Sequence, residues 1–134
     1  LRVGYGLSTA VVADVLNRVR QPFNVNSLAL AAACAALKDS DYLEQSRRLN
    51  EAGMQQLQDG FRELGLGWIP SRGNFIALDL GQVAAPVYQG LLREGVIVRP
   101  VANYGMPDHL RITIGLPAEN TRLLEALSKV LARG

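Results

Sequence analysis

The sequence predicts an α+β fold in which helices cover one face of a small sheet. Apolar residues recur at steps of three and four in some segments and alternate with polar residues in others. From residue 67 these segments follow the order strand, strand, helix, strand, strand, helix. The chain has 134 residues, of which 49% are hydrophobic and 19% charged, as in ordinary globular domains. Such a chain can bury a core without a metal or a disulfide.

The first forty residues are expected to form a short strand followed by two helices. Leu1–Tyr5 has the composition of a strand, and the valine-rich stretch before Pro22 and the Ala-rich stretch Leu28–Leu37 have helical patterns. Side chains that can cap these helices precede them: Ser8 or Thr9, and Asn26 or Ser27. Because the strand begins at the first residue with no segment leading into it, we expect the chain to be a fragment of a longer protein.

A long helix is expected next, and the predicted sheet follows it. Asp41 and Glu44 have the spacing of a capping box, and Gly65 is placed to end this helix. Strands are expected at residues 67–70, 74–80, 96–100 and 110–115, with a helix at 83–94 and a last helix that opens at Pro117.

Composition and charge exclude several classes of function. The net charge is only +2, and the twelve arginines and two lysines are dispersed, which argues against a nucleic-acid partner. The longest apolar stretch, Ser27–Leu37, is much shorter than the roughly 18 to 20 residues that span a bilayer. The single Cys34 cannot form an internal disulfide and is expected to be a small core residue in a cytoplasmic protein. No cluster of Cys and His indicates a metal site, and His109 has no nucleophile at a diagnostic spacing.

Two arginines lie on predicted strands at equal distances from a turn. Arg99 and Arg111 each stand six residues from Gly105, so an antiparallel hairpin in that register brings them directly opposite each other. Like charges in such a pair destabilise a sheet by a few tenths to about 1 kcal/mol. The spacing alone leaves two interpretations open. Either an anion lies between the two side chains, or both charged ends are solvated at the rim of the sheet with their stems over apolar surface.

A third arginine, Arg2, precedes a glycine-rich stretch. The sequence GYGLST imitates a phosphate-binding turn, but Thr9 occupies the place of the third glycine in G-x-G-x-x-G. No acidic residue follows at the usual distance, so a dinucleotide fingerprint is not supported.

Several motifs together resemble one known family. LRVGYGLS, RQPFNVNSLA, GNFIALDL and GVIVRPVANYGMPDHLRITIGLPAEN are similar to the C-terminal third of fold-type I, class I/II aminotransferases that depend on pyridoxal phosphate, most closely the histidinol-phosphate aminotransferases. The resemblance covers essentially the whole chain. It implies that residues 1–39 are the end of a large domain and the linker, and that residues 40–134 are the C-terminal small domain.

The resemblance also implies roles for the three arginines. Arg2 matches the residue that binds the cofactor phosphate, and Arg111 matches the residue that holds a substrate carboxylate. Arg99 matches the residue that helps to hold the substrate phosphate in histidinol-phosphate aminotransferases. The implied parent is a cytoplasmic homodimer that transfers an amino group between histidinol phosphate and 2-oxoglutarate, in histidine biosynthesis.

The family's Schiff-base lysine has no counterpart in this chain, which leaves it without a catalytic residue. The resemblance places that lysine a few residues before Leu1, and neither Lys38 nor Lys129 lies in the corresponding motif. The chain alone is therefore expected to be inactive. Three other interpretations stay open: part of an aminotransferase for aromatic or other amino acids, a non-enzymatic module that senses amino acids, or a folding unit without a ligand of its own.

The absence of the motif lysine predicts that the isolated chain forms no covalent adduct with pyridoxal phosphate at a specific site. Absorbance spectra, followed by borohydride reduction and peptide mapping, measure this. A stoichiometric adduct on either Lys38 or Lys129 would contradict the interpretation of the chain as a fragment without its catalytic residue.

Overall fold

The computed structural model of the chain describes residues 2–133, which form two compact units, Leu1–Gln45 and Ser46–Gly134. The helices and strands in chain order are α1 (Ala10–Val19), α2 (Ser27–Ala36), α3 (Ser40–Glu63), β1 (Gly67–Ile69), β2 (Phe75–Asp79), α4 (Ala84–Arg93), β3 (Arg99–Pro100), the 3₁₀ helix η1 (Ala102–Tyr104), β4 (His109–Thr113) and α5 (Pro117–Leu131).

The N-terminal unit contains the two predicted helices but not the predicted strand. Residues 2–9 form neither helix nor strand, so the prediction of a strand at 1–5 is wrong for residues 2–5, and Leu1 lies outside the described residues. A strand needs a hydrogen-bonding neighbour, and residues 2–45 of this unit form no sheet. The Asn26 side chain accepts a hydrogen bond from the Ala29 backbone N–H at 2.8 Å, which confirms the predicted cap of α2.

This unit buries very little of its apolar surface. Among residues 2–45 only Ala29 is buried, and the apolar residues of α1 are exposed. Cys34 is exposed, so its predicted place in a core is wrong. Two short helices with few partners cannot enclose a core, since burial requires surfaces on several sides.

Helix α3 begins one residue before the predicted cap. The Asp39 side chain accepts a hydrogen bond from the Tyr42 N–H at 3.0 Å, so Asp39 caps the first turn in place of Asp41. At the other end Gly65 has a φ of +71°, which glycine adopts without strain, and the Leu66 N–H bonds the Phe61 carbonyl at 2.9 Å. The predicted end of the helix is confirmed.

The C-terminal unit contains a four-stranded antiparallel sheet in the order β1, β2, β4, β3. Strand β3 has only two residues, although five were predicted. Val96 closes the end of α4, because its N–H bonds the carbonyl of Leu91 at 2.9 Å, and β3 pairs with β4 only at Arg99 and Pro100. Gly95 has a φ of +75° there, which turns the chain back toward the sheet.

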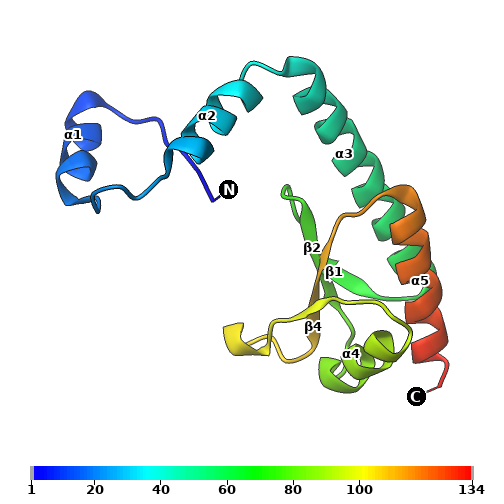
Figure 1. Cartoon of the computed structure of the whole chain (residues 1–134). Coiled ribbons are helices and arrows are strands. Elements are labelled where there is room, and N and C mark those ends of the chain that lie inside the picture. Colours follow the sequence, from blue (N-terminus) through cyan, green and yellow to red (C-terminus); the bar gives the residue numbers. More distant parts are fainter. Residues whose placement is uncertain (1, 134) are drawn as a thin grey trace. The chain divides into compact units, whose positions relative to one another are not determined.

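One face of the sheet is covered by helices and the other is open. Helices α3, α4 and α5 all contribute to one core, and α5 runs alongside the C-terminal part of α3 (Figure 1). The largest fully buried side chains of this core are Phe61, Leu57, Ile76, Leu78, Leu91, Leu110, Ile112 and Leu127. The predicted α+β fold with helices on one face of a small sheet is confirmed. No helix within residues 2–133 combines the length and the apolar character needed to cross a membrane.

Candidate functional site

The two predicted strand arginines face each other on the open side of the sheet. Arg99 of β3 is the register partner of Arg111 of β4, which confirms the pairing expected from their spacing around Gly105. On its other side Arg111 is opposite Ala77 of β2. The neighbours of Arg111 along β4, Leu110 and Ile112, point into the core and are fully or almost fully buried. The alternation of the strand therefore places the guanidinium on the uncovered face.

The charges of this arginine pair have no protein counter-ion within the described residues. Across residues 2–133, no carboxylate lies within ion-pair distance of Arg99 or Arg111. Arg99 is exposed and Arg111 is half-buried. Two like charges in adjacent strands repel, so this part of the surface favours a bound anion.

An aromatic ring supports one of the two guanidinium groups. The Cζ atom of Arg111 lies 5.0 Å from the centroid of the Phe75 ring. Phe75 belongs to β2, where it pairs with Thr113, two residues along β4 from Arg111. Such a contact attracts the cation to the ring face and restricts its orientation, while the N–H groups at its edge can still donate to an anion. No local sequence pattern indicates a role for Phe75, since only the register of β2 and β4 brings it beside Arg111.

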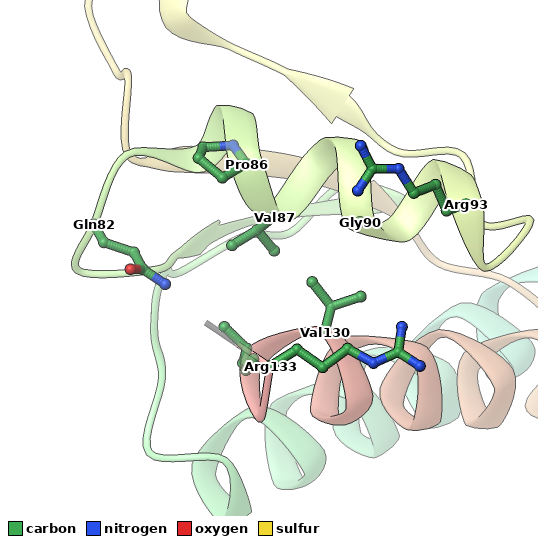
Figure 2. Close-up of a pocket in the computed structure, with 8 residues that line it drawn as sticks. Gln82, Pro86, Val87, Gly90, Arg93, Val130 and Arg133 are labelled. Atoms are coloured by element: carbon green, nitrogen blue, oxygen red, sulfur yellow. The ribbon is translucent and has the colours of Figure 1, made fainter.

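A groove between α4 and α5 lies on the helical layer and contains none of the predicted site residues. Its volume is about 260 Å³. Figure 2 shows Val87 and Val130 facing each other across it, with Arg93 and Arg133 near one end. Arg133 is already engaged, because its guanidinium bonds the Glu94 carboxylate at 3.0 Å.

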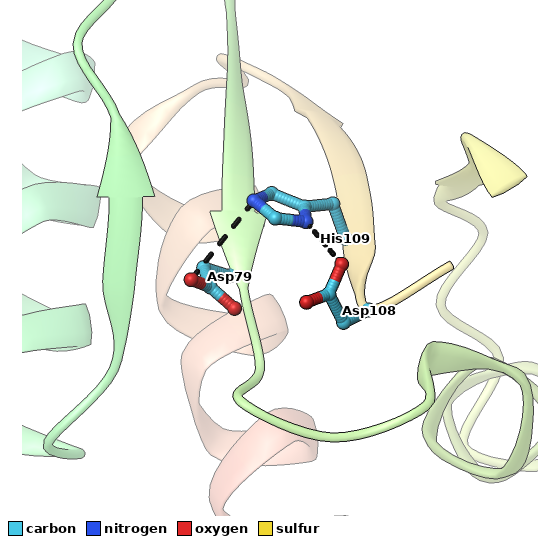
Figure 3. A group of neighbouring side chains, drawn as sticks. All are labelled: Asp79, Asp108 and His109. Carbon is cyan, nitrogen blue, oxygen red and sulfur yellow. Dashed lines mark hydrogen bonds and ion pairs between the residues drawn. The ribbon is translucent and has the colours of Figure 1, made fainter. Parts of the chain in front are cut away.

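A second group of polar side chains lies where β2 ends and β4 begins, at Asp79, Asp108 and His109 (Figure 3). His109 Nδ1 and Asp108 Oδ1 are 2.7 Å apart, and His109 Nε2 lies 4.0 Å from Asp79 Oδ2. Asp79 also accepts a hydrogen bond from the Gly81 N–H at 2.9 Å. The hydrogen bond from His109 holds the pKa of Asp108 below its usual range. Both carboxylates therefore have partners within the fold, and the group fixes the loop that enters β4.

Arg2 belongs to the N-terminal unit, whereas the paired strands belong to the C-terminal unit. Its side chain is exposed, and no residue in the described part of the chain forms an ion pair with it. Gly4 and Gly6 follow it, and a Cβ atom added at either glycine would meet no atom within 4 Å. The backbone beside Arg2 is therefore open to the approach of a ligand.

Comparison with known proteins identifies the family. The family model for aminotransferases of class I and II matches residues 1–127 of the chain. The chain belongs to the class I and II aminotransferase family. This result confirms the resemblance inferred from the motifs.

The curated relatives of this aminotransferase chain are much longer than the chain itself. It is 87% identical over 134 residues to histidinol-phosphate aminotransferase 2 of Pseudomonas fluorescens (strain Pf0-1), covering 100% of this chain and 36% of that protein. It is 76% identical over 132 residues to histidinol-phosphate aminotransferase 2 of Pseudomonas aeruginosa, covering 98% of this chain and 36% of that protein. The chain thus spans about a third of the length of these relatives.

A solved structure shares the same arrangement of helices and strands. The histidinol-phosphate aminotransferase of Sinorhizobium meliloti, determined in complex with pyridoxal 5'-phosphate, superposes with a TM-score of 0.80 at 30% identity. The match covers 95% of this chain and 36% of that one. The fold of this aminotransferase chain is therefore that of the corresponding part of a fold-type I enzyme, as predicted.

The His109 hydrogen bond to Asp108 predicts a pH dependence of stability. The pKa of Asp108 is lower in the folded chain than in the unfolded one, so its contribution is present above the unfolded pKa and is lost as the pH falls through the folded pKa. The Asp108→Asn variant keeps an acceptor oxygen but cannot ionise. Its free energy of unfolding should fall less than that of the unaltered chain between about pH 5 and pH 2, measured by urea denaturation. Parallel curves for the two proteins would contradict this role of Asp108.

Proposed function

We propose that this chain is the C-terminal part of a pyridoxal-phosphate-dependent aminotransferase that uses histidinol phosphate and 2-oxoglutarate as its substrates. The observation that carries the proposal is the direct pairing of Arg99 with Arg111 on an open sheet face, where residues 2–133 provide no counter-ion. The names and high identity of the curated relatives support the same substrates. The proposal also includes that the full-length protein to which this chain belongs is a cytoplasmic homodimer.

The arginine pair suits both substrates because each one is an anion of a different shape. The guanidinium of Arg111, held against the Phe75 ring, presents two parallel N–H donors to a carboxylate. Arg99, exposed on the neighbouring strand, adds the second positive charge that a phosphate or a distal carboxylate needs. The bound anion also offsets the repulsion between the two like charges.

Arg2 would bind the phosphate of the cofactor in this proposal. Its exposed guanidinium, which forms no ion pair with any described residue, and the open backbone at Gly4 and Gly6 both fit a phosphate ligand. Pyridoxal phosphate, when bound, would supply the electron sink that amino-group transfer requires. The residues of this chain would then bind and orient charged groups, without a covalent role.

The division of the parent into domains also belongs to the proposal. Residues 1–39 would complete the large domain and the linker, and residues 40–134 would form the small domain. The division between the two compact units of the structure falls after Gln45, which is close to this boundary along the chain. The apolar side chains that α1 exposes, including Val15 at 53% and Leu16 at 58%, support packing of this segment against the rest of the parent chain.

The Arg111→Lys variant of the full-length enzyme tests the proposed carboxylate site. Lysine keeps the charge but loses the paired donors, so kcat/KM for 2-oxoglutarate should fall about tenfold or more, which corresponds to about 1.4 kcal/mol. Arg62→Lys, on the helical layer and paired with Asp59, is the matched control and should leave kcat/KM unchanged.

The Arg99→Ala variant separates the proposed substrate from the alternatives. It should reduce kcat/KM for histidinol phosphate much more than for an amino acid without a phosphate, because only the former loses a phosphate contact. Equal turnover of histidinol phosphate with and without Arg99 would favour an aminotransferase for other amino acids. A full-length parent that binds amino acids but transfers no amino group would instead favour the sensing module.

The Arg2→Ala variant of the full-length enzyme tests the cofactor-phosphate role. Loss of hydrogen bonds to a charged group should weaken the binding of pyridoxal phosphate by about 1.5 to 3 kcal/mol, measured by equilibrium dialysis. Arg18→Ala, on α1 of the same unit, is the control and should not change the affinity. Unchanged affinity in the Arg2→Ala variant would remove Arg2 from the cofactor site.

A further inference from the structure

Asn120 is a buried polar residue in the first turns of α5. Its exposed fraction is 2%, and it is the one polar or charged residue in the buried class among residues 2–133. Burial of an amide costs free energy unless its donors and acceptor all find partners. A polar side chain at this depth therefore has to be explained by the groups that it binds.

The amide of Asn120 holds both polar groups of one backbone residue. Its Oδ1 accepts a hydrogen bond from the Gly115 N–H at 2.9 Å, and its Nδ2 donates to the Gly115 carbonyl at 3.2 Å. The second Nδ2 proton is donated to Oε1 of Gln56 on α3 at 3.1 Å. The amide thus uses one acceptor and two donors, and it ties the chain just beyond β4 to two helices.

A glycine at position 53 of α3 lets this helix lie directly against the contact. A Cβ atom added at Gly53 of α3 would lie 2.6 Å from Ile114 Cγ2, 3.0 Å from Asn120 Nδ2 and 3.2 Å from the Gly115 carbonyl oxygen. Only a glycine allows α3 to approach the end of β4 and the Asn120 amide so closely. The end of β4 is therefore fixed from the helical side of the sheet.

The same helix also holds the chain that leads into β3. Arg122, two residues after Asn120, donates to the Glu94 carbonyl at 3.0 Å, directly before the turn at Gly95. Strand β3 itself pairs with β4 at only two positions, Arg99 with Arg111 and Pro100 with Leu110. A ladder of two residue pairs defines the register weakly, so contacts outside it must help to keep the two strands aligned.

We infer that Asn120 is a positioning residue for the anion site: by fixing Gly115 at the end of β4, it keeps Arg111 aligned with Arg99. Arg122 has the corresponding role on the chain that enters β3. Without the Asn120 amide, the Gly115 N–H and carbonyl lose these partners. The end of β4 then keeps its pairing with β2, including the bond from the Ile114 N–H to the Asn74 carbonyl at 2.9 Å, but its alignment with β3 depends on two residue pairs alone. This inference rests on the proposed function of the arginine pair as the binding site for substrate anions.

The test uses the full-length enzyme with its cofactor and compares Asn120→Ala with Leu127→Ala. Leu127 lies on the same helix, is fully buried and takes part in the core, so its truncation lowers stability without touching Gly115. Asn120→Ala should raise KM for 2-oxoglutarate on the order of tenfold, because a small displacement of a binding group is costly. Leu127→Ala should lower Tm while leaving KM unchanged.

The Arg122→Ala variant tests the inference even if Asn120→Ala folds poorly, and hydrogen exchange adds a second measurement if it folds. The exposed Arg122→Ala variant should raise KM for histidinol phosphate, since it releases the chain before Arg99. Hydrogen exchange should become faster in the peptide that contains Gly115 in Asn120→Ala, and not in Leu127→Ala under native conditions.

The outcomes separate this inference from the proposed function. If Arg111→Lys does not change the kinetics for 2-oxoglutarate, the proposed function fails. If Arg111→Lys raises KM but Asn120→Ala and Arg122→Ala leave it at the level of the Leu127→Ala control, only the positioning role is overturned.

Discussion

The pairing of β4 with a strand on each side is the constraint on which the rest of the structure depends. Its five-residue register with β2 turns Leu110 and Ile112 toward the helices and leaves Arg111 and His109 on the opposite face. A shift of one residue would bury a guanidinium and expose two large apolar side chains. The free energy gained by burying Leu110 and Ile112 therefore fixes the side on which the charged residues lie.

The open face of the sheet brings two positive charges together. Their repulsion costs free energy, and the same two charges attract an anion. Arg99 and Arg111 are opposite each other, and the rest of the described chain offers them no carboxylate. The two carboxylates nearest along the strands, Asp79 and Asp108, bind Gly81 and His109 instead. The positive charges are thus left available for a ligand, and the Phe75 ring restricts the orientation of Arg111 without neutralising it.

The two units differ in how much of their apolar surface they bury. In the C-terminal unit three helices and a sheet enclose one core, whereas the N-terminal unit buries only Ala29 among residues 2–45. Such exposure of α1 and α2 fits segments that pack against other parts of a longer chain. The chain spans 36% of the length of these relatives, and the difference in burial between its two units supports the proposed division into the end of a large domain and a small domain.

The sequence by itself determined the order of the elements in the C-terminal unit, the one-sided covering of the sheet and the pairing of Arg99 with Arg111. These follow from local periodicity and from the equal spacing of the two arginines around Gly105. The tertiary structure alone decided that Val96 closes α4 and that β3 has only two residues, that Cys34 is exposed, and that Phe75 and Asn120 support the strand that carries Arg111. The contacts of Phe75 with Arg111 and of Asn120 with Gln56 join residues far apart in the chain. Local patterns contain no information about such contacts until the register of the sheet and the packing of the helices are known.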